Sequence, residues 1–222
     1  MHIALIADGN GRWGIKHFGS RAKGHEEGAK ALYRLLSDIP QGVSYLTFYG
    51  LSVDNIQKRP KDEVDWLYEV IGTNLEKALS IAEEKDIRLN FIGNGGLPDA
   101  LRNGIQRAKQ ATRDNEGLVF TLALSYSGRD EIIRAATSLQ ALDIPISEES
   151  LGAALDTCGL PDVDMVVRTG GERRLSGFLI WQSSYAELFF SDTLFPDFTS
   201  VELRAMIAEY HKRERRFGGL KC

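Results

Sequence analysis

Near its amino terminus the chain reads Ile3-Ala4-Leu5-Ile6-Ala7-Asp8-Gly9-Asn10-Gly11. The apolar run at residues 3–7 has the length of a strand, and such an unbroken run is typical of a strand buried on both faces, as in a parallel sheet. Further runs of this kind lie at residues 43–49, 87–92, 118–124 and 163–167, with a weaker one at 178–181. These runs predict the strands of a central, mostly parallel sheet.

Helical patterns lie between the predicted strands. Apolar side chains recur every three or four positions in residues 61–84, 97–113, 129–142 and 200–215. Strands that alternate with helices of this length indicate an α/β fold, in which helices flank the sheet. No repeat, linker or low-complexity tract divides the sequence, so we expect residues 1–222 to form a single domain.

The overall composition excludes several classes of protein. The chain has 27 basic and 31 acidic residues and a net charge of -4, and a mildly acidic chain is a poor candidate for nucleic-acid binding. Its two cysteines, Cys158 and Cys222, have no metal-site spacing and form no disulfide framework, which is typical of a reduced cytoplasmic protein. No stretch approaches the roughly 18 apolar residues of a membrane span, so we expect any membrane contact to be peripheral.

The loop after the first predicted strand, Asp8-Gly9-Asn10-Gly11-Arg12-Trp13, combines groups that suit a phosphate. Two glycines before a predicted helix let backbone N–H groups approach an anion closely, and Arg12 adds a guanidinium group. The Asp8 carboxylate suits Mg2+, which needs only one or two protein carboxylates when phosphate and water supply its other ligands. An ordinary strand-to-helix turn is the alternative interpretation of this loop alone.

The same loop also resembles a dinucleotide-binding fingerprint. Gly9, Gly11 and Gly14 match the pattern Gly-x-Gly-x-x-Gly, which is confirmed only by an acidic residue at the end of a second strand about 20 residues later. Residues 29–36 have a helical pattern instead, and no Gly-Lys-Ser/Thr of a P-loop follows the loop. Nucleotide binding is therefore disfavoured.

Three further clusters are rich in basic side chains. In residues 21–25, Arg21 and His25 lie four positions apart at a predicted helix start; residues 168–176 carry three arginines and a serine around two glycines; residues 213–219 form a basic end. Arginine forks bind diphosphate groups and keep their charge. Each cluster has a structural alternative, respectively a structural histidine, a solvated charge run and a basic helix end. Together, however, they favour two anionic substrates with a metal ion between them.

Polar residues follow several predicted strands directly. Asp8, Ser52, Ser125 and Arg168 come after the first, second, fourth and fifth strands. In open parallel sheets, ligands bind at the carboxyl ends of the strands. We therefore expect these side chains to converge at one edge of the sheet.

These residues resemble the cis-prenyltransferases, the Z-type prenyl diphosphate synthases of which undecaprenyl diphosphate synthase is the bacterial archetype. The resemblance runs from about His2 to Gly219. The matching motifs are Asp8-Gly9-Asn10-Gly11-Arg12-Trp13, Arg21 with Gly24-His25, Ser52 with Asn55, Arg59-Pro60, Tyr126 with Gly128-Arg129, Arg168-Thr169-Gly170-Gly171-Glu172, Arg174-Leu175-Ser176, Trp181-Gln182, Tyr185-Ala186-Glu187-Leu188, Pro196-Asp197-Phe198 and Arg213-Glu214-Arg215-Arg216-Phe217-Gly218.

The resemblance implies a Mg2+-dependent transferase that condenses isopentenyl diphosphate with an allylic diphosphate, farnesyl diphosphate in particular, to make a Z-polyprenyl diphosphate. It also implies a parallel sheet flanked by helices, an apolar tunnel for the growing chain, and a homodimer. We expect such an enzyme to be cytoplasmic and to contact a membrane only through its lipid product.

The resemblance further implies roles for individual residues. For the allylic substrate these are Gly9, Asn10, Gly11, Arg12, Trp13, Arg21, His25 and Arg59. For isopentenyl diphosphate they are Arg168, Arg174, Ser176, Arg216 and Gly218. The implied catalytic residues are Asp8, Ser52 and Asn55, and the implied metal-binding residues are Asp8 and Glu187.

Some positions depart from the family pattern and leave alternatives open. Leu51 stands where the family has an aromatic residue, Ile56 stands where it has tryptophan, and one extra residue precedes Arg59. One alternative is therefore a short-chain or irregular prenyl diphosphate synthase that uses small allylic substrates. An alternative of another class is a non-catalytic partner subunit, but such partners tend to lose the aspartate, arginines and histidine that this chain keeps.

Overall fold

The structure is a computed structural model that describes residues 1–93 and 96–214. One six-stranded sheet runs through these residues, and all its strand pairs are parallel, in the order β3-β4-β2-β1-β5-β6. The strands are β1 (His2–Ile6), β2 (Tyr45–Ser52), β3 (Arg88–Ile92), β4 (Val119–Tyr126), β5 (Met165–Arg168) and β6 (Glu187–Phe190). The expectation of an α/β fold with a central parallel sheet is confirmed.

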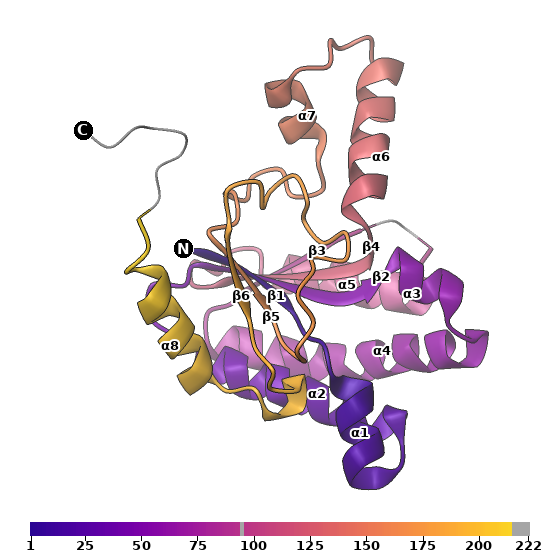
Figure 1. Cartoon of the computed structure of the whole chain (residues 1–222). Helices are drawn as coiled ribbons and strands as arrows, with labels where there is room; N and C mark the ends of the chain where they lie inside the picture. The colour runs from indigo at the N-terminus through magenta and orange to yellow at the C-terminus, as the bar shows by residue number, and fades with distance from the viewer. Residues whose placement is uncertain (94–95, 215–222) are drawn as a thin grey trace.

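Helices lie on both sides of this sheet (Figure 1). They are α1 (Asn10–Phe18), α2 (Arg21–Ser37), α3 (Val53–Lys58), α4 (Lys61–Glu84), α5 (Asp99–Ala111), α6 (Gly128–Ala141), α7 (Glu148–Ala154) and α8 (Ser200–Tyr210), with a short 3-10 turn η1 (Phe195–Asp197). Within the described part of the chain, no helix is long and apolar enough to cross a membrane.

The largest core lies between the sheet and the helices α2, α4, α5 and α8. On β1, the fully buried Ile3 and Leu5 point into this core, whereas Ala4 and Ile6 belong to a second core on the other face. Both faces of β1 are therefore covered, which is why its sequence is an unbroken apolar run. The helices α6 and α7 stand away from this second face and pack against each other around Leu139.

The weak strand predicted at residues 178–181 is wrong. Phe178 and Leu179 are fully buried, but they belong to a turn, in which Leu179 has a left-handed φ of 44°, that packs on the second face of the sheet. The sixth strand is the later segment Glu187–Phe190 at the edge of the sheet. An apolar run of this length arises equally from a buried turn, so the run alone does not distinguish the two.

The first two helices cross at unusually short range because glycines face each other there. A Cβ on Gly24 would lie 1.9 Å from the carbonyl oxygen of Asn10, and a Cβ on Gly14 would lie 2.2 Å from that of Ser20. Gly24 therefore serves the contact between α1 and α2. This crossing places the beginning of α1 beside the beginning of α2.

Candidate active site

Three of the four polar residues predicted to converge meet in one cavity at the carboxyl edge of the sheet, whereas the fourth, Ser125 near the end of β4, does not line it. Asp8 follows β1, while Ser52 and Arg168 end β2 and β5, the two strands that pair with β1. The chain leaves β1 toward β2 on one side and returns through β5 on the other, so this edge is the switch point where ligands bind in open α/β sheets. These three residues line one cavity.

Arg168 connects the groups at the mouth of this cavity. Its Nη2 donates to Asp8 Oδ2 at 2.9 Å, and its Nη1 donates to the carbonyl oxygen of Arg174 at 2.6 Å and to Ser176 Oγ at 2.8 Å. The residue is only 5% exposed, and its buried Nε has no partner among the described residues. A buried guanidinium with this many partners fixes both the carboxylate and the 174–176 segment.

The beginning of α1 presents free backbone donors next to this carboxylate. Gly9 precedes the helix with a left-handed φ of 106°, and no side chain caps the first turn. Arg12 donates to Asp8 Oδ1 at 3.3 Å and stays half exposed. Gly11 and Gly170 leave room for Arg21 and Arg12, because a Cβ on either would lie within about 3 Å of a guanidinium group. The arrangement is suited to an anion at the helix N-terminus.

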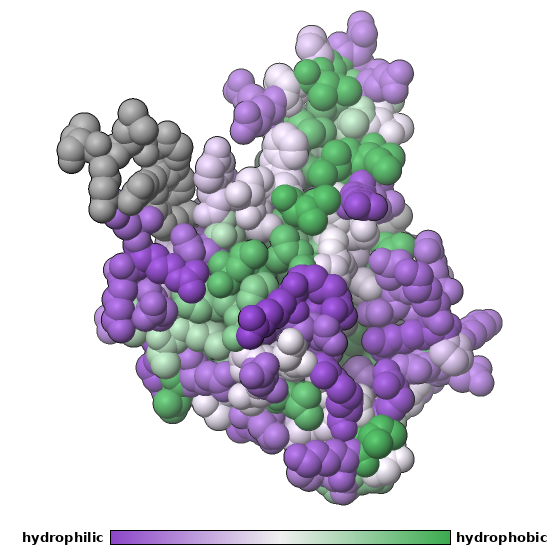
Figure 2. All heavy atoms as spheres, in the orientation of Figure 1, coloured by the Kyte–Doolittle hydropathy of each residue, from purple (hydrophilic) through white to green (hydrophobic). Residues whose placement is uncertain are grey.

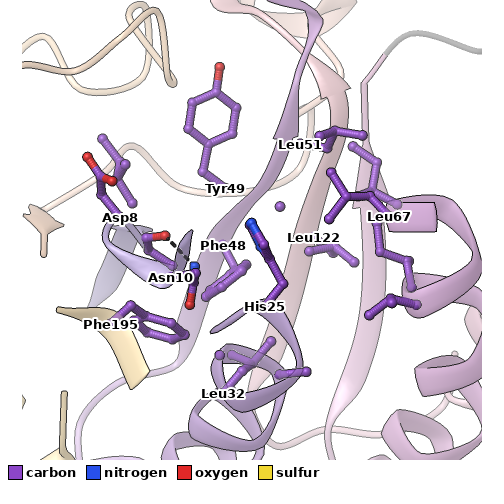
Figure 3. A pocket seen from close by; sticks show the side chains of 18 of the residues that line it. Asp8, Asn10, His25, Leu32, Phe48, Tyr49, Leu51, Leu67, Leu122 and Phe195 are labelled. Carbon is purple, nitrogen blue, oxygen red and sulfur yellow. Dashed lines mark hydrogen bonds between the residues drawn. The ribbon is translucent and has the colours of Figure 1, made fainter. Parts of the chain in front are cut away.

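His25 projects from α2 into the cavity (Figure 3). Burial first, and then the positive charges of Arg59 and Arg21, lower the pKa of its imidazole to about 4. Its Nε2 is buried and has no partner among the described residues. At neutral pH the imidazole is therefore an uncharged group with a free hydrogen-bonding nitrogen.

Arg59 and Arg21 share one carboxylate near His25. Arg59 Nη1 donates to Glu63 Oε1 at 3.2 Å, and Arg21 Nη2 lies 3.7 Å from the same oxygen. Two arginines around one glutamate leave a net positive charge at this side of the mouth, which favours an anionic ligand.

Ser52 and Asn55 lie where β2 passes into α3. Ser52 Oγ accepts a hydrogen bond from the backbone N–H of Asn55 at 3.0 Å, so Ser52 caps α3. Both residues line the cavity. Leu51 also lines it, whereas Ile56 is partly buried against the cluster that joins α3, α4 and α5.

Behind this polar mouth the cavity is apolar and has a volume of about 420 Å3. It runs between α2, α4 and the sheet (Figure 3), and its apolar lining includes Leu32, Phe48, Leu51, Leu67, Leu122 and Phe195. The expected apolar tunnel thus matches a cavity with a charged opening.

The structure does not bring every predicted residue to this mouth. Glu187 begins β6, at the end of the sheet opposite to Asp8, and it accepts a hydrogen bond from Arg213 at 2.6 Å. The indole of Trp13 packs on the ring of His17 at 4.4 Å. Arg216 and Gly218 lie outside the described residues. Because Glu187 and Asp8 lie at opposite ends of the sheet, these two carboxylates cannot share a metal ion within one chain.

Tyr49 was not predicted from the sequence, and it contacts the 174–176 segment at the mouth. Its hydroxyl hydrogen points toward two carbonyl oxygens, that of Tyr126 at 3.2 Å and that of Ser176 at 3.4 Å, and its ring stacks on Phe178 at 4.3 Å. Ser176 has a left-handed φ of 52°, which a residue with a Cβ rarely adopts, so this segment needs such support. The position of Tyr49 near the end of the second predicted strand was the available signal.

Comparison with known proteins agrees with this geometry. The family model described as "Putative undecaprenyl diphosphate synthase" matches residues 6–218. The chain belongs to this family. The resemblance noted in the sequence is therefore confirmed, and the protein is a prenyltransferase.

Individual relatives of this prenyltransferase cover almost its whole length. An isoprenyl transferase of Wolinella succinogenes is 44% identical over 99% of this chain and 96% of its own. A ditrans,polycis-undecaprenyl-diphosphate synthase of Micrococcus luteus, described as (2E,6E)-farnesyl-diphosphate specific, is 43% identical over 99% of this chain and 91% of its own. The structure of lavandulyl diphosphate synthase from Lavandula x intermedia, in complex with dimethylallyl diphosphate, has a TM-score of 0.92 and 33% identity, and covers 98% of this chain and 97% of that one.

Proposed function

We propose that this prenyltransferase condenses isopentenyl diphosphate with farnesyl diphosphate, in a Mg2+-dependent reaction, to make a Z-polyprenyl diphosphate. The observation that carries the proposal is a single cavity with an arginine-lined mouth and an apolar interior. Diphosphate groups need the first and prenyl chains need the second. The farnesyl-specific relative from Micrococcus luteus supports the choice of allylic substrate.

The two diphosphates occupy neighbouring positions at the mouth in this proposal. The allylic diphosphate lies at the beginning of α1, between Arg12, Arg21 and His25, where backbone donors and positive charge are already in place. Isopentenyl diphosphate lies beside Arg174 and Ser176, on the segment that Arg168 and Tyr49 hold. Arg174 is half exposed and paired with Glu172, so a diphosphate has to replace that carboxylate as its partner.

Asp8 is suited to hold Mg2+ together with a substrate diphosphate. Its carboxylate is partly exposed at the mouth, and its contact with Arg12 is long, at 3.3 Å. The described residues contain no group of three or more side chains that could hold a metal ion alone. A site with one protein carboxylate fits Mg2+, which takes its remaining ligands from phosphate and water. When bound, the ion supplies positive charge to the leaving diphosphate.

The protein's own residues carry out the rest of the proposed chemistry. Ionisation of the allylic C–O bond builds negative charge on the leaving diphosphate, which Arg12, Arg21 and the α1 N–H groups stabilise. The apolar cavity protects the allylic cation from water until the double bond of isopentenyl diphosphate attacks it. The condensed cation then loses a proton, which the released diphosphate can accept, and the new double bond forms. Ser52 and Asn55 line the cavity, and in this proposal they lie next to the reacting ends of the two substrates.

A product assay tests this proposal. Purified protein, Mg2+ and labelled isopentenyl diphosphate are incubated separately with dimethylallyl, geranyl and farnesyl diphosphate, and the products are sized by mass spectrometry. A series of long products from farnesyl diphosphate is the expected result. Absence of any product with all three substrates would contradict the proposal and favour a partner subunit.

A second candidate function, a short-chain or irregular synthase, has one specific observation in its favour. The lavandulyl diphosphate synthase with the similar fold was solved with dimethylallyl diphosphate, an allylic substrate of a single isoprene unit. Leu51, which departs from the family pattern, lines the cavity in this chain. A single short or branched product formed from dimethylallyl diphosphate in the same assay would establish this second function.

We also propose that the enzyme is a cytoplasmic homodimer that contacts a membrane only through its lipid product. The exposed apolar side chains of Ile133, Leu142 and Leu188 support association, and Figure 2 shows apolar surface over α6. The metal-supporting role proposed for Glu187 depends on this association, since one chain alone separates it from Asp8. Light scattering after size-exclusion chromatography tests it, and a monomer mass at all concentrations would contradict it.

A further inference from the structure

The apolar wall of the cavity contains one pair of polar side chains that bond across two helices. Tyr33 of α2 donates its hydroxyl hydrogen toward Asn74 of α4, with Oδ1 at 2.8 Å and the carbonyl oxygen at 2.9 Å. Both residues line the cavity together with the apolar residues of the same helix faces, such as Leu32, Leu36 and Ile71. Asparagine is a poor residue for a helix interior, and a buried tyrosine hydroxyl needs a partner, so this pair has to be explained.

The pair separates two spaces of opposite character. On its inner side lies the apolar cavity. On its outer side lies a polar hollow of about 380 Å3, whose lining includes Glu26, Lys30, Glu69, Thr73 and Lys77. Tyr33, Asn74 and Val70 line both spaces, so the wall between them is one layer of side chains thick.

Tyr33 has a second contact with α4, made by its ring with Lys77 on the side of the polar hollow. The Nζ of Lys77 lies 4.6 Å from the centre of the Tyr33 ring, which is a cation–π contact. Burial raises the pKa of the Tyr33 hydroxyl to about 12, so it remains a hydrogen-bond donor at every working pH. Among the described residues, the other hydrogen bond or ion pair between α2 and α4 is the Arg21–Glu63 pair at the mouth, at 3.7 Å. Tyr33 and Asn74 are thus the brace that joins the two helices at depth.

The depth of this brace can be compared with the length of a prenyl chain. His25 and Tyr33 lie eight residues apart on α2, which corresponds to about 12 Å at the rise of an α-helix. With carbon–carbon bonds of about 1.5 Å, a four-bond isoprene unit advances roughly 5 Å. The brace therefore lies about two to three isoprene units beyond the diphosphate, where the far end of a farnesyl chain arrives.

We propose that Tyr33 and Asn74 determine product length, because their hydrogen bond fixes the separation of α2 and α4 at the depth that the growing chain must pass. This inference rests on the proposed function. A fixed separation limits the cross-section that is open to a chain folded back along the cavity. Without the hydrogen bond the helices can part toward the polar hollow, so the cavity holds a longer chain before release overtakes elongation.

The test uses variants that keep the bulk of both side chains. Tyr33→Phe removes only the hydroxyl, Asn74→Leu removes only the amide, and the double variant leaves no unpaired polar group in the wall. Thr73→Val is the matched control, since Thr73 is exposed on the outer side and, among the described residues, its hydroxyl bonds to the carbonyl oxygen of Glu69 in its own helix. Products from isopentenyl and farnesyl diphosphate are sized by mass spectrometry, and thermal unfolding confirms that each variant folds.

We expect Tyr33→Phe to raise the ratio of the longest wild-type products to the shorter ones by about fivefold, the typical effect of one buried hydrogen bond on an equilibrium. Asn74→Leu should have a smaller effect, because the Tyr33 hydroxyl keeps the main-chain carbonyl oxygen of residue 74, at 2.9 Å, as an acceptor. The double variant should show no more than the Tyr33→Phe effect, because Tyr33→Phe alone already removes the donor of both contacts to residue 74. Wild-type product ratios in folded Tyr33→Phe and double variants would overturn the inference, as would the same shift in Thr73→Val. Wild-type protein that makes no product would instead contradict the proposed function itself.

Discussion

The neutral imidazole of His25 leads to a quantitative prediction about stability and pH. Its folded-state pKa is lowered to about 4, mainly by burial and then by Arg59 and Arg21. In the unfolded chain a histidine has a pKa near 6.5, so between about pH 6.5 and pH 4 the unfolded state binds more protons than the folded state. The stability that the neutral imidazole contributes is therefore complete above pH 6.5 and is lost as the pH falls toward 4.

The magnitude follows from these two pKa values. At pH 5 the unfolded histidine is almost fully protonated and the folded one almost fully neutral, so the folded state loses about 2 kcal/mol relative to pH 7.5. His25→Gln removes the titrating group and keeps a polar side chain of similar reach. The difference in unfolding free energy between pH 7.5 and pH 5.0 should therefore be smaller in His25→Gln than in the wild type, by about 2 kcal/mol.

Urea unfolding followed by tryptophan fluorescence at the two pH values measures this difference. Burial also lowers the pKa of His2, so the variant should retain part of the pH dependence. His17→Gln, on the neighbouring helix α1, controls for the loss of one imidazole from an exposed position. If His25→Gln lost as much stability at pH 5.0 as the wild type does, the imidazole would not be neutral in the folded protein, and its assignment as an uncharged group in the mouth would be refuted.

Three further predictions follow from the same mouth and its supports. Gly24→Ala should destabilise the protein by more than about 2 kcal/mol, because the new Cβ meets the Asn10 carbonyl oxygen. Gly72→Ala has open space around it and should stabilise α4 by about 0.5–1 kcal/mol. Urea unfolding measures both changes, and equal effects would contradict the close contact between α1 and α2. Arg168→Lys should lower kcat/KM by about 100-fold, since a lysine ammonium cannot bond Asp8 and Ser176 at the same time. A near-normal kcat/KM in steady-state kinetics would refute the role of Arg168 in joining these two groups. Chelation of divalent ions should abolish product formation, and added Mg2+ should restore it. The Asp8→Asn variant should need a much higher Mg2+ concentration for activity. An unchanged Mg2+ dependence in that variant would exclude Asp8 as the Mg2+ ligand.

The sequence could predict those parts of the site that depend on strand ends. Asp8 and Arg168 lie far apart along the chain, but each ends an apolar run, and parallel strands place their carboxyl ends at one edge. The period of apolar residues likewise located α4 at its observed bounds, because helix periodicity is a local property. Both predictions needed no information about which strands are neighbours.

The parts that were missed depend on lateral distances between elements. The bond between Tyr33 and Asn74 exists because α2 and α4 lie side by side over the sheet, and a spacing of 41 residues carries no sign of that. Phe178 was misassigned because a buried turn and a buried strand have the same apolar composition. The metal-supporting role of Glu187 rests on resemblance alone and stays a prediction, and the position of this residue at the amino end of β6 became visible only with the register of the sheet.

The bonds of Arg168 imply that the two proposed diphosphate positions are not independent. One end of its guanidinium holds Asp8, beside the allylic position, and the other holds Ser176 and the carbonyl of Arg174, beside the isopentenyl position. Because the side chain is buried, it cannot swing to follow one partner without releasing the other. Any ligand that draws the Asp8 carboxylate toward itself therefore changes the position of the 174–176 segment as well. A substitution that weakens the hydrogen bonds of Arg168 should accordingly raise the KM values of both substrates together. Substitution of a residue that contacts only one diphosphate would raise only one of the two KM values.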